Sequence, residues 1–309
     1  MVRNRLAFSG LLVAGILSLS AHPAGNDDLI HNPDVSGFHF KLAGILNTGN
    51  EAMPLVGQLS KDGLKLYFTS QNYKGEKQLF VMKRLKPGDA FQNPERVNVP
   101  FPDNAYDMIM PSVSADESMM VFVSSADGTQ KGNDIYMAFL QKQDPANTSL
   151  VRTLDEINTS GISDSYPWLS GDGLRIYFTK QQGSNIDFYF ASRSSIHEPF
   201  GQAKKMELTL PKAHNNMSCI LSADELEIFA LSGDKIYYAT RENLFSPFST
   251  PVVLAQSAHE GFITGITMTP DKSELFVFNS IGFRNTQILH FINTEAGKGE
   301  RTKVTAATR

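Results

Sequence analysis

The sequence predicts an all-β protein, a single β-propeller of five four-stranded blades. A Ser-x-Asp or Thr-x-Asp phrase returns five times, and each copy is followed by a short run rich in apolar and aromatic residues. The repeated aspartates, spaced about fifty residues apart, are Asp62, Asp116, Asp172, Asp224 and Asp271. Copies of one supersecondary unit of this size are typical of propellers and solenoids.

Each repeat contains four segments with the length and composition of strands. In the third repeat, residues 166–169 precede the aspartate, residues 176–178 follow it, and residues 187–190 form a third run. The aspartate lies between the first two strands, where its side chain can bond its own backbone and support a tight turn. We therefore assign the five aspartates a structural role.

The fourth strand of a blade predicts how the ring closes. It carries a phenylalanine and an apolar residue six positions later, as in Phe200 and Met206. The same pair precedes the first repeat as Phe40 and Leu46, whereas the fifth repeat has none of its own. We expect residues 38–47 to supply the outer strand of the last blade, because closure protects the sheet edges. Six blades would result if the leader or an insertion completed another sheet.

The ends of the chain predict export. Arg3 and Arg5 precede an apolar stretch from residue 6 to 19 and then small residues, which is typical of a cleaved signal peptide. An uncleaved anchor is the alternative, although the stretch is shorter than the ~20 residues of a membrane span. The expected organisation is a signal peptide at 1–24, a flexible leader at 25–37, a propeller at 38–293 and a disordered basic tail at 294–309.

The cysteine content and the net charge limit which cellular compartments and which classes of partner are expected. Cys219 is the only cysteine, so neither lipid attachment at the signal junction nor an intrachain disulfide is expected. The formal net charge is −4, a balance that does not attract nucleic acid. We predict a periplasmic or secreted protein that is not a lipoprotein, has no transmembrane segment after signal removal and forms a monomeric scaffold.

The turn, the aromatic run after it and the Asp-Ile-Tyr strand resemble the TolB-like, WD-repeat-like β-propeller family of bacterial envelope proteins. The third repeat carries the resemblance best, through Asn158, Pro167, Ser170, Asp172, Gly173, Tyr177, Phe178 and Arg193. The resemblance covers residues 38–293. It implies an envelope protein whose propeller binds proteins or cell-wall components, without implying an activity.

The candidate ligand site is the rim of the axial opening, where the innermost strands begin. Residues just before those strands offer a polar group in every blade, and such a ring could hold a divalent cation, a sugar or a basic peptide terminus. The alternative is that they cap strand ends. The candidates are Glu51, Tyr106, Asp107, Asp164, Tyr166, His214, Asn216, His259 and Glu260.

Two functions remain open at this point. We favour a noncatalytic module without a cofactor that binds an envelope protein or a cell-wall or polysaccharide component. The alternative is a secreted glycoside hydrolase or lyase that uses rim carboxylates, since glycoside cleavage needs two carboxyl groups about 5 to 10 Å apart. No local catalytic signature is present, and no two histidines have the spacing of a metal motif. We assign no catalytic or metal-binding residue.

Overall fold

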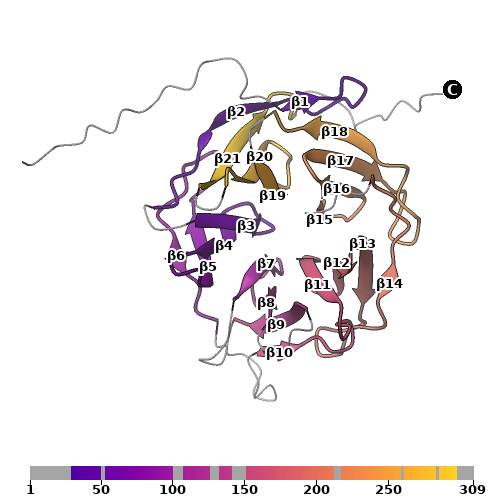
Figure 1. Ribbon diagram of the computed structural model, residues 1–309. Coiled ribbons are helices and arrows are strands. Elements are labelled where there is room, and N and C mark those ends of the chain that lie inside the picture. Colours follow the sequence, from indigo (N-terminus) through magenta and orange to yellow (C-terminus); the bar gives the residue numbers. More distant parts are fainter. Residues whose placement is uncertain are drawn as a thin grey trace, which may run out of the picture.

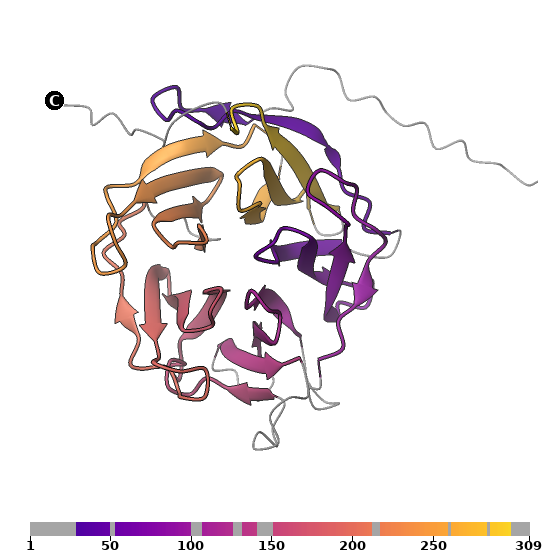
Figure 2. The same cartoon turned by 180° about the vertical axis from the view of Figure 1, so that it is seen from behind.

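Five antiparallel sheets stand around one axis in the computed structural model (Figures 1 and 2). The structure describes residues 29–49, 53–99, 107–125, 132–140, 151–211, 217–258, 261–282 and 285–297. All regular secondary structure in these ranges is strand. The prediction of a five-bladed β-propeller is confirmed, and no sixth sheet forms within the described ranges.

The first three blades use consecutive strands. Blade 1 contains β3 (Met53–Leu59), β4 (Lys65–Gln71), β5 (Lys77–Lys83) and β6 (Glu95–Arg96). Blade 2 contains β7 (Ile109–Val113), β8 (Met119–Ser124), β9 (Asp134–Phe139) and β10 (Val151–Thr153). Blade 3 contains β11 (Ser163–Leu169), β12 (Arg175–Gln182), β13 (Asn185–Ser192) and β14 (Lys204–Lys205).

The last two blades also use strands from the N-terminal part of the chain. Blade 4 contains β15 (Met217–Leu221), β16 (Glu227–Ser232), β17 (Lys235–Thr240) and β18 (Val252–Gln256), with β1 (Ile30–His31) added outside β18. Blade 5 contains β19 (Phe262–Met268), β20 (Glu274–Ser280), β21 (Thr286–Asn293) and, at its outer edge, β2 (Phe40–Ile45).

The two ends of the propeller axis carry different loops. The innermost strands are β3, β7, β11, β15 and β19 (Figure 1). Since all neighbouring strands are antiparallel, the five aspartate turns lie at one end of the axis together with the loops between third and fourth strands. We call this end the turn face. The opposite end, where the inner strands begin, is the strand-start face.

The expected closure by an N-terminal strand is confirmed, because β2 pairs with β21 from Phe40 opposite Asn293 to Ile45 opposite Leu289. The structure also shows a second closure, in which β1 pairs with β18. Leu29 and Val35 are buried, so residues 29–37 are folded onto the propeller although the sequence analysis places them in a flexible leader. A two-residue strand pairs through its backbone and leaves no side-chain pattern that would predict it.

The aspartate turns share one geometry. In the first four blades, the serine Oγ donates to the aspartate Oδ1 over 2.6 Å. The residue after the aspartate has a positive φ in every blade, and these residues are Gly63, Glu117, Gly173, Glu225 and Lys272. A left-handed conformation costs a residue with a side chain about 1 kcal/mol, so glycine is the least strained choice.

The three non-glycine turn residues join neighbouring blades. Glu225 accepts hydrogen bonds from Arg175 of blade 3, with 2.7 Å between Arg175 Nη2 and Glu225 Oε1. Glu117 of blade 2 forms an ion pair with Lys65 of blade 1. Lys272 of blade 5 forms one with Glu227 of blade 4. These contacts offset the backbone strain at the turn and connect consecutive blades near the turn face.

Replacing Asp116 with asparagine is expected to lower the urea midpoint of unfolding at pH 7. The Ser114 hydroxyl bond holds the pKa of Asp116 below its ordinary value of 3.8. Because the folded pKa is depressed, the stabilisation is present above about pH 4 and is lost as the pH falls through the folded value. The midpoints of the two proteins should therefore converge near pH 2, measured by tryptophan fluorescence.

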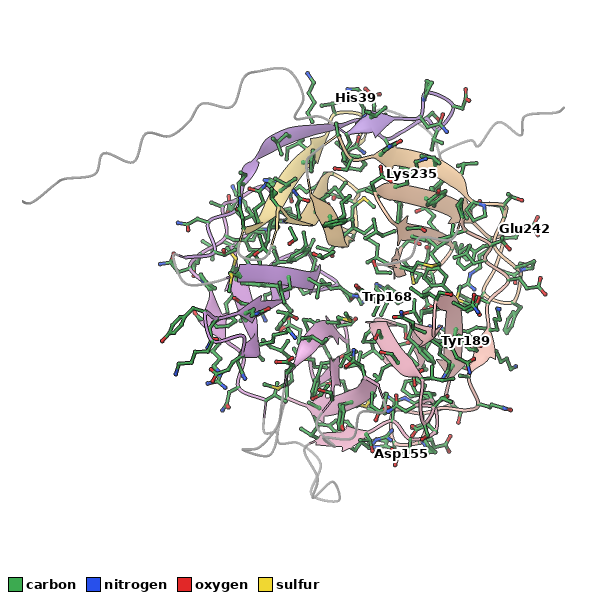
Figure 3. The ribbon with its side chains drawn as sticks, viewed as in Figure 1. His39, Asp155, Trp168, Tyr189, Lys235 and Glu242 are labelled. Atoms are coloured by element: carbon green, nitrogen blue, oxygen red, sulfur yellow. The ribbon has the colours of Figure 1, made fainter. Side chains whose placement is uncertain are left out.

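Asp155→Asn is the matched control, because Asp155 is exposed on the outside of blade 2 (Figure 3). It should change stability by less than ~0.5 kcal/mol at either pH. An equal loss in the two variants would contradict a specific role for the turn.

Candidate functional site

The structure describes three of the nine residues proposed for the rim at the strand-start face. These are Asp107, Asp164 and Tyr166. The other six proposed residues lie outside the described residues: Glu51, Tyr106, His214, Asn216, His259 and Glu260. The geometry of the rim is therefore built from blades 2 and 3.

Asp107 joins the start of blade 2 to blade 1. Its Oδ2 lies 2.6 Å from Lys77 Nζ, and its Oδ1 accepts a hydrogen bond from the Lys77 backbone over 3.2 Å. Lys77 is the first residue of β5, so the contact fixes a strand end. About a third of the Asp107 side chain remains exposed, at 33%. The carboxylate is partly accessible, but its charge is already balanced by the lysine.

Asp164 is fully buried at the start of β11. Its Oδ1 lies 2.8 Å from Lys180 Nζ, and its Oδ2 accepts from the Thr159 amide over 2.7 Å. Burial raises the pKa of the Asp164 carboxyl, while Lys180 and the Thr159 amide act against that rise. Lys180 also donates to the Ile157 carbonyl over 2.6 Å. Asp164 therefore holds the preceding loop against β12 and presents no carboxylate to solvent.

Tyr166 lies at a β-bulge halfway along β11. The register between β11 and β12 shifts between Ser165 and Trp168, and Tyr166 has a φ of 51°. Met110 in β7 has an equivalent φ of 57°, and its sulfur lies 3.3 Å from the Tyr166 amide nitrogen. Burial raises the pKa of Tyr166 to about 12. A bulge changes the direction in which nearby side chains point. Here the bulges of β7 and β11 place the Met110 sulfur against the Tyr166 amide, so the inner strands of blades 2 and 3 are in contact.

The described residues offer little chemistry for a metal or a nucleophile. Within the ranges that the structure covers, no three His, Cys, Asp or Glu side chains gather as metal ligands would. Cys219 is buried in β15, and burial raises the pKa of its thiol to about 12. Reactive cysteines need the thiolate and access to solvent, so Cys219 acts as a small core residue.

The sequence analysis missed a repeated arginine–phenylalanine contact at the turn face. In blades 1, 3 and 4, an arginine after the third strand stacks on a phenylalanine seven positions later, at 4.5 to 4.7 Å between guanidinium carbon and ring centroid. The pairs are Arg84 with Phe91, Arg193 with Phe200, and Arg241 with Phe248. Aligning the repeats from these phenylalanines would have revealed the arginines.

Several solved structures are similar to this chain. No protein-family model and no curated protein matches the sequence. The catalytic domain of an α-L-arabinofuranosidase of family GH62 from Coprinopsis cinerea aligns with a TM-score of 0.55 and 10% identity over 86% of this chain and 99% of that one. At such identity the likeness shows the fold alone.

Two TolB structures are also similar. The putative TolB from Agrobacterium tumefaciens aligns with a TM-score of 0.46 and 12% identity over 86% of this chain and 89% of that one. TolB from Acinetobacter baumannii aligns with a TM-score of 0.44 and 20% identity over 77% of this chain. The alignment spans 54% of the length of that TolB.

Among the residues that the structure describes, no helix has the length and hydropathy needed to cross a membrane.

Proposed function

We propose that the protein is an exported, noncatalytic propeller that binds a protein or cell-wall ligand through the axial opening at the strand-start face. The observation that carries the proposal is that both described rim carboxylates already have hydrogen-bonding partners within the chain. Asp107 and Asp164 each contact a lysine and a backbone amide, as strand-end caps do. Carboxylates bound in this way are poorly suited to acid, base or nucleophile roles. They leave a polar rim of fixed shape, which suits recognition.

The signal-like N-terminus supports export. The resemblance to TolB-like propellers supports an envelope protein or cell-wall component as the partner. The mature chain would carry more acidic than basic residues. Its partner in the envelope is therefore expected to be basic or neutral as a whole. A carbohydrate-active role is the weaker reading, because glycoside cleavage needs one carboxyl group that can give up a proton and another that stays ionised.

A photocrosslinking amino acid at Phe262 is expected to capture one defined envelope component in intact cells. Phe262 begins β19 at the strand-start face and is 68% exposed. Phe245 is the matched control, because it is 98% exposed in the loop between β17 and β18 at the turn face. Crosslinked material would be identified by mass spectrometry.

Capture from position 262 and not from position 245 would support binding through the strand-start rim. Equal capture from both positions, or none from either, would contradict it. Release of sugar from arabinan or xylan by the purified protein would contradict the noncatalytic assignment.

A further inference from the structure

A lysine from blade 1 reaches across the axis near the turn face. The second residue of the five aspartate turns is Lys61, Ala115, Gly171, Ala223 or Pro270, so only blade 1 places a long side chain there. The Lys61 ammonium lies 3.6 Å from the ring centroid of Trp168, which belongs to blade 3. Gln58 makes a parallel contact, because its amide donates to the Pro167 carbonyl over 3.1 Å.

Lys61 and Trp168 line a cavity at the axis. Its volume is about 50 Å³, and its walls include Phe229, Ile220 and Met268 beside the lysine and the indole. Trp168 lies at the inner edge of blade 3, next to the central opening (Figure 3). The space suits a group of a few heavy atoms, since a single water needs only about 10–15 Å³ of such space.

The Lys61 ammonium lacks an acceptor of its own in the described part of the chain. Its recorded contact there is the Trp168 ring, which can face only part of the ammonium group. The nearby charges are mostly engaged with other partners: Glu225 with Arg175, Lys272 with Glu227, and Asp62 with Ser60. Burial lowers the pKa of Lys61 to about 7, although Glu225 acts to raise it. Lys61 as a whole is partly exposed, but its ammonium lies against the cavity wall without an acceptor among the described residues, which is costly, so an anion would be stabilised here.

The wall opposite Lys61 is held in place before any ligand arrives. Trp168 packs edge-on against Tyr177 with 5.8 Å between ring centroids. The Tyr177 hydroxyl donates to Glu225 over 2.7 Å and accepts from Arg241 over 2.9 Å. A preformed wall reduces the entropy lost on binding.

We propose that this cavity at the turn face binds a carboxylate group, with Lys61 as its ion-pair partner and Trp168 as its apolar wall. One ammonium matches the single charge of a carboxylate better than the double charge of a phosphate monoester. The apolar side chains in the wall favour an acid with an aliphatic portion next to the carboxylate. Such a group is found on small organic acids and at peptide C-termini. The site lies at the opposite end of the axis from the strand-start rim, so the two proposals stand independently.

The test uses the only tryptophan of the chain as its reporter. The full chain would be titrated with hexanoate, with acetyl-trialanine bearing a free C-terminus, and with the same peptide amidated. A saturable change in Trp168 fluorescence is expected for the two acids, with a dissociation constant on the order of 1 mM. No change is expected for the amide. A response to only one of the acids would support the site and identify its source of carboxylate.

Lys61→Met should weaken binding at least about tenfold, because methionine keeps the apolar stem on the indole but removes the charge. Lys86→Met is the matched control, since Lys86 is exposed in the β5–β6 loop of the same blade at the same face. It should bind like the unsubstituted protein. Equal binding by the Lys61 variant, a response to the amide, or no response to either acid would overturn the proposal.

A second measurement needs no variant. Because the pKa of Lys61 is lowered to about 7, a bound carboxylate should draw a fraction of a proton onto Lys61 at pH 7, since an opposite charge favours the ammonium form. Calorimetric titration in phosphate and in Tris buffer would reveal this uptake as a difference in binding heat. Identical heats after correction for buffer ionisation would overturn the assignment of Lys61 as the partner.

Discussion

Replacing Arg84 with methionine is expected to lower the free energy of unfolding by about 3–5 kcal/mol. The Arg84 side chain is fully buried between blades 1 and 5 and donates to both oxygens of Glu274, over 2.9 and 2.6 Å. Among the described residues, the substitution would leave the buried Glu274 carboxylate with His290 as its one side-chain partner. The loss would be measured as a shift in the urea midpoint.

Lys83→Met is the control from the adjacent position. Lys83 pairs with Glu95 over 2.6 Å, but both side chains are substantially exposed, so its loss should cost less than about 1 kcal/mol. The double variant Arg84→Met, Glu274→Met should recover most of the stability that Arg84→Met alone loses, because no unpaired charge then remains buried. Similar midpoints for the two single variants would contradict a dominant role for the buried pair.

The same pair predicts acid sensitivity at the junction of blades 1 and 5. Burial raises the pKa of Glu274, but His290 and Arg84 outweigh burial and lower it from 4.5 to about 2. Since the folded pKa is depressed, this stabilisation is complete above about pH 4.5 and disappears as the pH falls towards 2. The double variant should lose less stability than the unsubstituted protein over this range.

Replacing Phe40 with alanine is expected to cost about 3–5 kcal/mol, because this side chain is fully buried where β2 closes blade 5. The neighbouring Phe38 packs against Phe229 and Tyr238 of blade 4, at 5.7 and 5.4 Å between ring centroids. Loss of the phenylalanine should loosen the whole N-terminal segment. The measurements are the urea midpoint and the hydrogen exchange of β21 amides.

Ile45→Ala tests the same strand on its outer side. Ile45 is 59% exposed, so its substitution should change stability by less than about 0.5 kcal/mol and leave exchange in β21 unchanged. Equal effects of Phe40→Ala and Ile45→Ala would contradict the prediction that burial of Phe40 holds β2 in blade 5.

The parts of the fold that repeat were predictable from sequence. Five copies of the aspartate turn defined the five blades, and the displaced Phe40 and Leu46 pair defined the closing strand. The turn residues Glu117, Glu225 and Lys272 were visible as departures from glycine, yet their inter-blade ion pairs were not predictable. Those pairs depend on how consecutive blades pack, which no local pattern records.

The candidate site was predictable only as a region. Asp107 and Asp164 do lie where the inner strands begin, but their lysine partners come from other strands, 30 and 16 positions away in the chain. The left-handed backbone at Tyr166 and Met110 has no sequence signature, since neither residue type favours it. Lys61 was not predicted as a site residue, because its contact with Trp168 of blade 3 requires the closed ring.

The inter-blade ion pairs also make the blades distinguishable from one another. At the first and third junctions the base belongs to the earlier blade and the acid to the later one, whereas at the fourth junction Glu227 is on the earlier blade and Lys272 on the later. If blade 5 packed directly against blade 3, Arg175 would face Lys272 and two like charges would meet. The reversed order of charge at the fourth junction therefore penalises a ring that leaves out blade 4.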